Sequence, residues 1–246
     1  MAKERRLKMA KKLHIMAVGA HCGDMELVAG GVIAKYTKAG HEASIVHLTP
    51  GEKGHPRLSP EEYAKQKIEE AKRAAEILGA EPIFLPYRDA ELPVNDEVKF
   101  RLAEVIREKK PDVIITHWKN SMHPDHANTH LIVDGAILIA ALPAFELKNP
   151  AHSVRGVFYG ENWEDPYGYE PDVYVDITST YDIWVEAIKQ YQFVTGGISS
   201  FRYLDYYTHL AVVRGCLMGV KYAQAFMMPE GANKRRGGSL PGFTLE

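Results

Sequence analysis

Short apolar runs alternate with amphipathic helical patterns along the first 141 residues. The runs are apolar throughout, which is typical of strands buried on both faces of a sheet. Between them, apolar residues recur every three or four positions, as in the stripe formed by Ala64, Ile68, Ala71, Ala75 and Leu78. This alternation predicts a mostly parallel sheet with helices on both faces. The strands are expected at Leu13–Val18, Ala43–Thr49, Pro82–Leu85 and Asp112–Thr116, and the helices at about Met25–Ala39, between a cap at Ser59 and a stop at Gly79, Asn95–Lys109 and Ala127–Ala141.

The pattern changes beyond Pro143. Two further strands are expected there, at Val154–Tyr159 and Val173–Asp176, and two further helices, at Tyr181–Phe193 and Tyr203–Tyr222. No linker long enough to separate a second domain is visible. We therefore predict a single α/β domain over residues 13–230, preceded by a basic tail (1–12) and followed by an irregular tail (231–246).

Composition narrows the class of protein. An apolar fraction of 46% and a charged fraction of 25% over 246 residues exclude a disordered chain, a collagen-like fibre and a small disulfide scaffold. The net charge of −2 offers no basic field for nucleic-acid binding. The longest apolar run, Ala136–Phe145, is too short to span a bilayer, and the basic first residues lack the apolar core of a secretory signal. We expect a soluble, cytoplasmic protein without nucleic-acid or membrane partners.

Chemically active side chains follow each of the first four predicted strands. These loops, at residues 19–26, 49–55, 87–89 and 117–126, carry His, Asp, Glu or Arg. Ligands of open parallel sheets bind beyond the carboxyl ends of the strands. Because parallel strands bring these ends to one edge, we expect the four loops to converge on a single site.

Two of these loops together hold the ligand set of a catalytic metal. His21 and Asp24 share one loop, and His123, Asp125 and His126 share another. Two imidazoles and one carboxylate, with a fourth position left for water, are typical of catalytic zinc, and they also suit iron or manganese. A remaining His/Asp pair could handle protons or stabilise an oxyanion. Taken singly, either aspartate could merely cap a helix, but two such clusters at one sheet edge favour the metal.

Other chemistries fit the sequence less well. The turn after the first strand, GAHCGDMELVAGG, does not match the G-x-G-x-x-G fingerprint, because a His and an Asp stand where a dinucleotide needs bare backbone. No G-x-S-x-G nucleophile elbow is present. The two cysteines, Cys22 and Cys216, form no CxxC pair, which argues against a thiolate zinc site or a dithiol redox centre.

The chain resembles the PIG-L/LmbE family of zinc-dependent N-acetylglucosaminyl deacetylases. The family motifs A-H-P-D-D-x-E and H-P-D-H correspond to Ala20–Glu26 (AHCGDME) and His123–His126 (HPDH). Further likeness covers nearly the whole chain, through the segments Leu48–Gly54, Ala74–Asp89, Lys110–Trp118 and Tyr222–Phe226.

The resemblance implies a Rossmann-like (LmbE-like) fold holding one divalent metal, usually zinc (Zn2+). By motif position, His21, Asp24 and His126 would be the ligands, His123 would polarise the amide or stabilise the oxyanion, and Asp125 would orient His123. The implied reaction removes the acetyl group of an N-acetylglucosamine-type conjugate through a metal-bound water. Family members also suggest a homo-oligomer, either a trimer or a hexamer.

One departure from the motif concerns the mechanism. Gly23 stands where the family has its general-base aspartate, and Cys22 replaces the motif proline. Glu26 is our first candidate for a substitute base, with Glu52 and Asp89 as alternatives by loop position; His123 with Asp125 could also shuttle the proton alone. A further alternative is a weakly active or non-catalytic protein that binds metal and a sugar ligand. The residues predicted to contact substrate are Glu52, Arg88 and Asp89.

Overall fold

A seven-stranded sheet forms the centre of the molecule. The computed structural model describes residues 12–165 and 167–229. The strand order is β3-β2-β1-β4-β5-β7-β6, in which β1 to β5 are parallel and β7 is antiparallel to both of its neighbours. The mostly parallel Rossmann-like sheet predicted from the sequence is confirmed. The strands are β1 (His14–Gly19), β2 (Glu42–His47), β3 (Glu81–Phe84), β4 (Val113–Thr116), β5 (Gly156–Gly160), β6 (Val173–Asp176) and β7 (Ala223–Met227).

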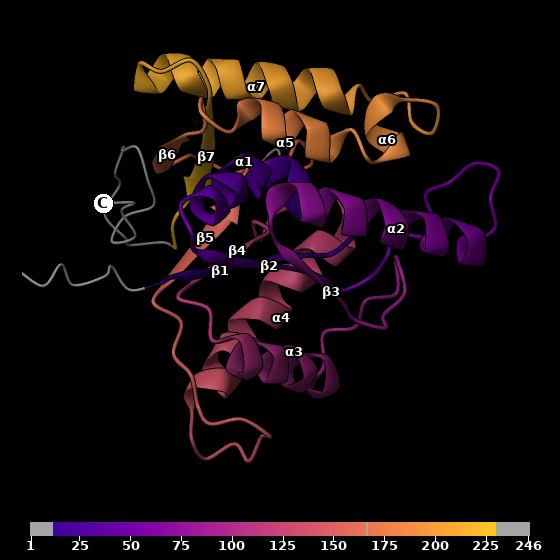
Figure 1. Cartoon of the computed structure of the whole chain (residues 1–246). Helices are drawn as coiled ribbons and strands as arrows, with labels where there is room; N and C mark the ends of the chain where they lie inside the picture. Colours follow the sequence, from indigo (N-terminus) through magenta and orange to yellow (C-terminus); the bar gives the residue numbers. More distant parts are fainter. Residues whose placement is uncertain (1–11, 166, 230–246) are drawn as a thin grey trace, which may run out of the picture.

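Helices cover both faces of this sheet (Figure 1). In the view of Figure 1, α1 and α2 lie above the sheet with α5, α6 and α7 stacked further out, whereas α3 and α4 lie below. The helices are α1 (Asp24–Lys38), α2 (Pro60–Leu78), α3 (Asp96–Lys109), α4 (Pro124–Ala141), α5 (Tyr181–Ile188), α6 (Gln192–Thr195) and α7 (Tyr203–Met218).

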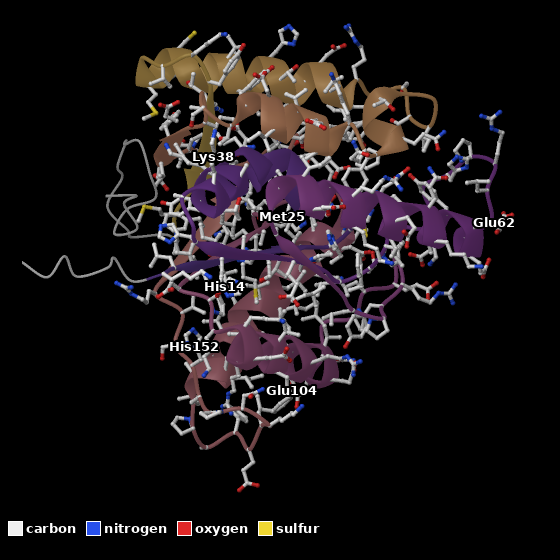
Figure 2. All side chains as sticks on the ribbon, in the orientation of Figure 1. His14, Met25, Lys38, Glu62, Glu104 and His152 are labelled. Carbon is white, nitrogen blue, oxygen red and sulfur yellow. The ribbon has the colours of Figure 1, made fainter. Side chains whose placement is uncertain are left out.

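Two apolar cores lie on the two faces of the sheet. Alternate residues of β1 divide between them: Ile15 packs with the core under α1, and Met16 packs with the core under α3 and α4. This division explains why the strands are mostly apolar rather than alternating between apolar and polar residues. In Figure 2, Met25 lies inside, next to the sheet, whereas Glu62 and Glu104 are exposed on the outer sides of their helices.

The structure departs from the predicted elements near the C-terminus. The single helix expected at Tyr181–Phe193 is broken into α5 and α6, because Tyr191 takes an extended conformation and its buried hydroxyl donates to Glu26 Oε1 (2.6 Å). Strand β7 is not among the predicted elements, and the helix predicted directly before it, Tyr203–Tyr222, is too long. The helix ends earlier, at Gly219, whose φ of 80° suits glycine.

Arg107 of α3 anchors the C-terminal end of α4. The residue is 2% exposed, and its guanidinium donates to the carbonyl oxygens of residues 139, 140, 142, 145 and 149, at 2.8 to 3.2 Å. The last turn of a helix leaves its carbonyls without intrahelical partners. Arg107 supplies hydrogen bonds to these carbonyls and to carbonyls of the following loop. The end of α4 opposite to His123 and His126 is thereby fixed.

The predicted tails fall on residues outside the described part, except for Lys12. Within the described ranges, no helix combines the length and the apolar character needed to cross a membrane.

Candidate metal centre

The candidate site lies where the order of the sheet reverses. The chain runs from β1 outward to β2 and β3, and then returns to the other side of β1 with β4. In open α/β sheets, the carboxyl ends of the strands flanking this reversal are the usual place for a ligand. Asp24 follows β1, and His123 and His126 follow β4, so the fold brings the two predicted clusters together as expected.

The turn after β1 depends on a glycine. Gly23 precedes α1 with φ 106° and ψ −24°, in the left-handed region that side chains disfavour. The turn lets Asp24 Oδ2 accept a hydrogen bond from the backbone N–H of His21 (2.8 Å). Both side chains are thereby held on the same side of the turn.

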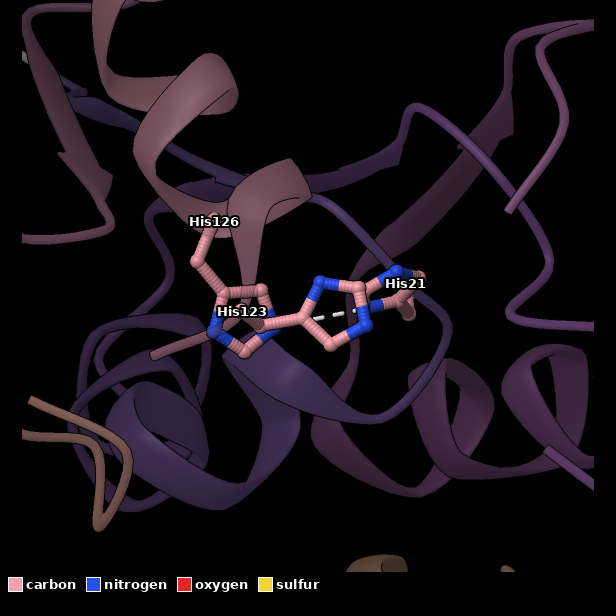
Figure 3. Close-up of side chains that lie close together, drawn as sticks. All are labelled: His21, His123 and His126. Atoms are coloured by element: carbon pink, nitrogen blue, oxygen red, sulfur yellow. Dashed lines mark hydrogen bonds between the residues drawn. The ribbon is translucent and has the colours of Figure 1, made fainter. Parts of the chain in front are cut away.

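The loop after β4 places two imidazoles at the start of α4. His123 caps the helix, and its Nδ1 accepts the backbone N–H of Asp125 (3.2 Å). His126 lies in the first turn, and its ring approaches those of His21 and His123 (Figure 3). Because Nδ1 of His123 accepts the N–H of Asp125, the neutral ring of His123 carries its proton on Nε2.

Three donor atoms form a nearly equilateral triangle. His21 Nδ1 lies 3.2 Å from Asp24 Oδ2 and 3.2 Å from His126 Nε2, and the third side, from His126 Nε2 to Asp24 Oδ2, is 3.3 Å. Ligands bound tetrahedrally at about 2.0–2.1 Å lie about 3.3 Å apart. The donor set therefore fits a small divalent cation, and its members are the three residues predicted as ligands.

The outer nitrogens of both ligand rings face carboxylates. His21 Nε2 lies 3.1 Å from Asp89 Oδ1 and 3.4 Å from Asp125 Oδ2. His126 Nδ1 lies 3.2 Å from Glu164 Oε2. Metal-binding histidines almost always donate their second N–H in this way, which fixes the orientation of the ring.

The electrostatics of the cluster favour a positive charge within it. Burial alone would lower the pKa of His21, but Asp24, Asp125 and Asp89 raise it well above its ordinary value. Burial would raise the pKa of Asp24, but His126 and His21 lower it well below the usual range. The carboxylates thus favour a positive charge at this position, whether a proton or a metal cation carries it.

His117 is a site residue that the sequence reasoning missed. It directly follows β4, and its Nε2 lies 3.2 Å from Asp24 Oδ2 and accepts the backbone N–H of Ala20 (3.0 Å). Its ring stacks on that of His126 with 4.1 Å between centroids. Burial, followed by the nearby charge of His126, lowers the pKa of His117 to about 3, so the ring is neutral. Asp24, His117 and His126 form an alternative group of possible ligands.

Asp125 does not orient His123 through its side chain, which corrects the expected role. The contact between them is the backbone N–H of Asp125 with His123 Nδ1. The Asp125 carboxylate turns instead toward His21 and accepts the backbone N–H of Ala90 (2.7 Å). Its position supports a ligand ring rather than the proposed oxyanion donor.

Three other predicted residues lie outside the pocket beside the triangle. Glu26 is fully buried beneath it, where it accepts from Tyr191 and from the N–H of Gly23. Glu52 accepts the backbone N–H of Asp89 with both oxygens, at 3.1 and 3.2 Å, and so holds that loop. The side chain of Arg88 is 64% exposed. Of the carboxylates considered as bases, Asp89 is the one that lines the pocket.

The pocket wall also includes aromatic side chains and a lysine. The pocket beside the triangle is lined, among others, by His21, Asp24, Asp89, His123, His126, Tyr63, Lys67, Asn162, Trp163, Glu164, Phe193, Tyr203 and Tyr207. The predicted ligands, His123 and Asp89 meet there as expected. Lys67 and Glu164 gave no sequence signal, because a lysine within a helix and a glutamate in a loop are usually solvated.

Comparison with known proteins identifies the family. The family model described as PIG-L, GlcNAc-PI de-N-acetylase, matches residues 16–137, which carry both histidine motifs. The chain belongs to the PIG-L family. It is 28% identical to diacetylchitobiose deacetylase of Thermococcus kodakarensis, over 88% of this chain and 83% of that protein.

Other relatives of this chain include a protein named for a different reaction. The chain is 27% identical to 4-oxalmesaconate hydratase of Pseudomonas putida, over 88% of this chain and 86% of that protein. Among solved structures, N,N'-diacetylchitobiose deacetylase of Pyrococcus horikoshii superimposes with a TM-score of 0.77 at 26% identity, covering 87% of this chain and 83% of that one. The relatives of this chain thus include deacetylases and a hydratase.

Proposed function

We propose that this protein is a metal-dependent deacetylase of N-acetylglucosamine-type conjugates, with zinc as the metal. The observation that carries the proposal is the triangle of His21, Asp24 and His126, whose sides of 3.2 to 3.3 Å fit a tetrahedral cation. Relatives that deacetylate diacetylchitobiose support the choice of substrate class.

The side chains around the triangle have separate roles in the proposed reaction. When bound, a divalent cation would activate water and polarise the amide carbonyl. His123 lines the pocket as a neutral ring, because burial and then the charges of His21 and His126 lower its pKa. With Nδ1 occupied by a backbone N–H, the ring offers its Nε2–H to the oxygen on which charge develops. Trp163, stacked on Phe201 at 4.1 Å, provides an aromatic surface for a sugar ring.

Two carboxylates can accept the proton in place of an aspartate at position 23. Asp89 and Glu164 both line the pocket, and each also faces the outer nitrogen of a ligand ring.

We expect Asp89→Asn and Glu164→Gln each to weaken metal affinity by about 10–100-fold, because each loses a carboxylate that holds a ligand ring. At saturating metal, the variant that lacks the proton acceptor should remain slower by about 10²–10⁴-fold. Metal titration followed by kcat measurement separates the two effects, and full activity of both variants at saturating metal would exclude both residues as the base.

Acetate release tests the proposed activity directly. The purified protein should release acetate from diacetylchitobiose or N-acetylglucosamine, lose this activity after treatment with a chelator, and regain it when zinc is restored. Zinc should also raise the melting temperature of the chelated protein, because binding to the native state alone stabilises it. Activity that is unchanged by thorough chelation would contradict the proposal.

A second candidate is the addition of water to an unsaturated carboxylate. The hydratase relative covers the chain as fully as the deacetylase does, and position 23 here carries no carboxylate to serve as a deacetylase base. An assay that follows loss of 4-oxalmesaconate, in parallel with acetate release, distinguishes the two reactions.

A further inference from the structure

The space beside Gly23 is filled by another element. A Cβ atom built on Gly23 would lie 2.7 and 2.8 Å from Cζ and Cε1 of Phe193, in helix α6. A side chain at position 23 is therefore blocked by both the backbone and the phenyl ring. The phenyl ring of Phe193 thus fills the space next to Asp24 that an aspartate side chain at position 23 would occupy.

The ammonium of Lys67 lies against this ring. Its Nζ is 4.1 Å from the centroid of Phe193 and 5.3 Å from that of Tyr191, and it donates to the carbonyl oxygen of Cys22. Lys67 is 5% exposed and lines the pocket beside the triangle. A positive charge thus stands next to the turn at residues 22–23, where the family motif would place a negative one.

Lys67 lacks a carboxylate partner in direct contact. Asp24, Glu26 and Glu70 act on it through space, but none of the ion pairs found among the described residues includes Lys67. Asp24 belongs to the ligand triangle, Glu26 accepts from Tyr191, and Glu70 Oε1 accepts from Gln66. An ammonium has three donors, and a buried charge is stabilised only when it is paired or fully hydrogen-bonded.

We propose that Lys67 binds a carboxylate of the substrate, and that the natural substrate carries this group within a few atoms of the bond that is cleaved. The inference rests on the proposed function only in taking this pocket as the active site. A carboxylate base beside the turn would repel such a substrate, whereas one ammonium neutralises one carboxylate charge. The aromatic wall excludes water from the pair and so strengthens it. Lys67 and Phe193 together make the pocket selective for a singly charged acid.

A matched pair of substrates tests this selectivity. N-Acetylmuramic acid and N-acetylglucosamine share the acetamide at C2. The former also carries a lactyl ether, and with it one carboxylate, on the adjacent O3. We expect kcat/KM to be at least about 10-fold higher for the acid, the size of one charge-assisted hydrogen bond. Lys67→Met should remove this preference, so that its kcat/KM values for the two sugars lie within about 3-fold of one another, and Lys67→Arg should retain it. Lys65→Met, an exposed position on the same helix, is the matched control.

Two results would overturn the inference. One is a wild-type protein that prefers the neutral sugar or treats both alike. The other is a Lys67→Met variant that loses activity toward both substrates equally, which indicates a structural role for the lysine. In either case, acetate release by the wild-type protein leaves the proposed deacetylase activity standing.

A binding measurement keeps the test independent of turnover. Calorimetric titration of the purified protein with lactate, and with lactamide as the neutral analogue, reports the subsite even if no acetamide is hydrolysed. Lactate should bind the wild-type protein at least about 10-fold more tightly than it binds Lys67→Met, and lactamide should not distinguish them. Equal lactate affinity in the two proteins would refute the subsite.

Discussion

Replacing His126 with Ala should remove the metal and lower deacetylase turnover by at least about 10³-fold, since metal activation of water and polarisation of the amide are lost together. His126 supplies one corner of the donor triangle, and its loss leaves His21 and Asp24, which are too few for a structured catalytic site. Metal analysis of the purified variant and an acetate-release assay measure the two effects.

A second histidine provides the control. His209 is exposed on α7, away from the pocket lining, so His209→Ala should keep full metal content and full activity. If His126→Ala retained one metal ion per chain, the assignment of the triangle would be wrong. The alternative group of Asp24, His117 and His126 is tested by His117→Ala, which should lose far less metal than His126→Ala.

Restoring the aspartate of the family motif, by Gly23→Asp, should lower both stability and activity. The sequence alone leaves both a gain and a loss of activity open, because another residue could supply the base that position 23 lacks. In the structure, φ of 106° disfavours any side chain, at about 1–2 kcal/mol. The collision with Phe193 at 2.7 Å adds about 1–3 kcal/mol of overpacking. Thermal or urea unfolding and acetate release should show the combined loss.

Gly40 separates backbone strain from collision. It also has a positive φ, of 90°, but nothing lies within 4 Å of its Cβ position. Gly40→Asp should therefore show only the backbone penalty, leaving activity unchanged. A Gly23→Asp protein that is as stable as Gly40→Asp and more active than the wild type would show that the natural chain simply lacks its base.

The fold could be predicted where strands are buried on both faces of the sheet, because such strands appear in the sequence as short apolar runs. Strands β1 to β4 are short, mostly apolar runs, and α2 ends at Gly79 as predicted. The failures arise from tertiary contacts. Gln224 interrupts the apolar run of β7, but its buried side chain accepts the N–H of Val32 in α1 (3.0 Å). Tyr191 ends a helical pattern because its hydroxyl reaches Glu26.

The site was predictable only as far as motifs reach. His21, Asp24 and His126 follow strands whose carboxyl ends must meet, so spacing and topology suffice to bring them together. The sequence could not place Lys67, because its burial depends on packing against the distant α6. Glu26 was misplaced for the related reason that a first-turn carboxylate can point either into a pocket or into the core.

The anchoring of α4 by Arg107 bears on the proposed metal site. Five carbonyl oxygens fix the far end of this helix through contacts that involve no donor of the triangle. The helix start that bears two of the histidines is thus held in place by the protein itself. We therefore expect the proposed cation to leave and return without unfolding α4, so that occupancy of the site, and with it the proposed activity, follows the supply of free cation.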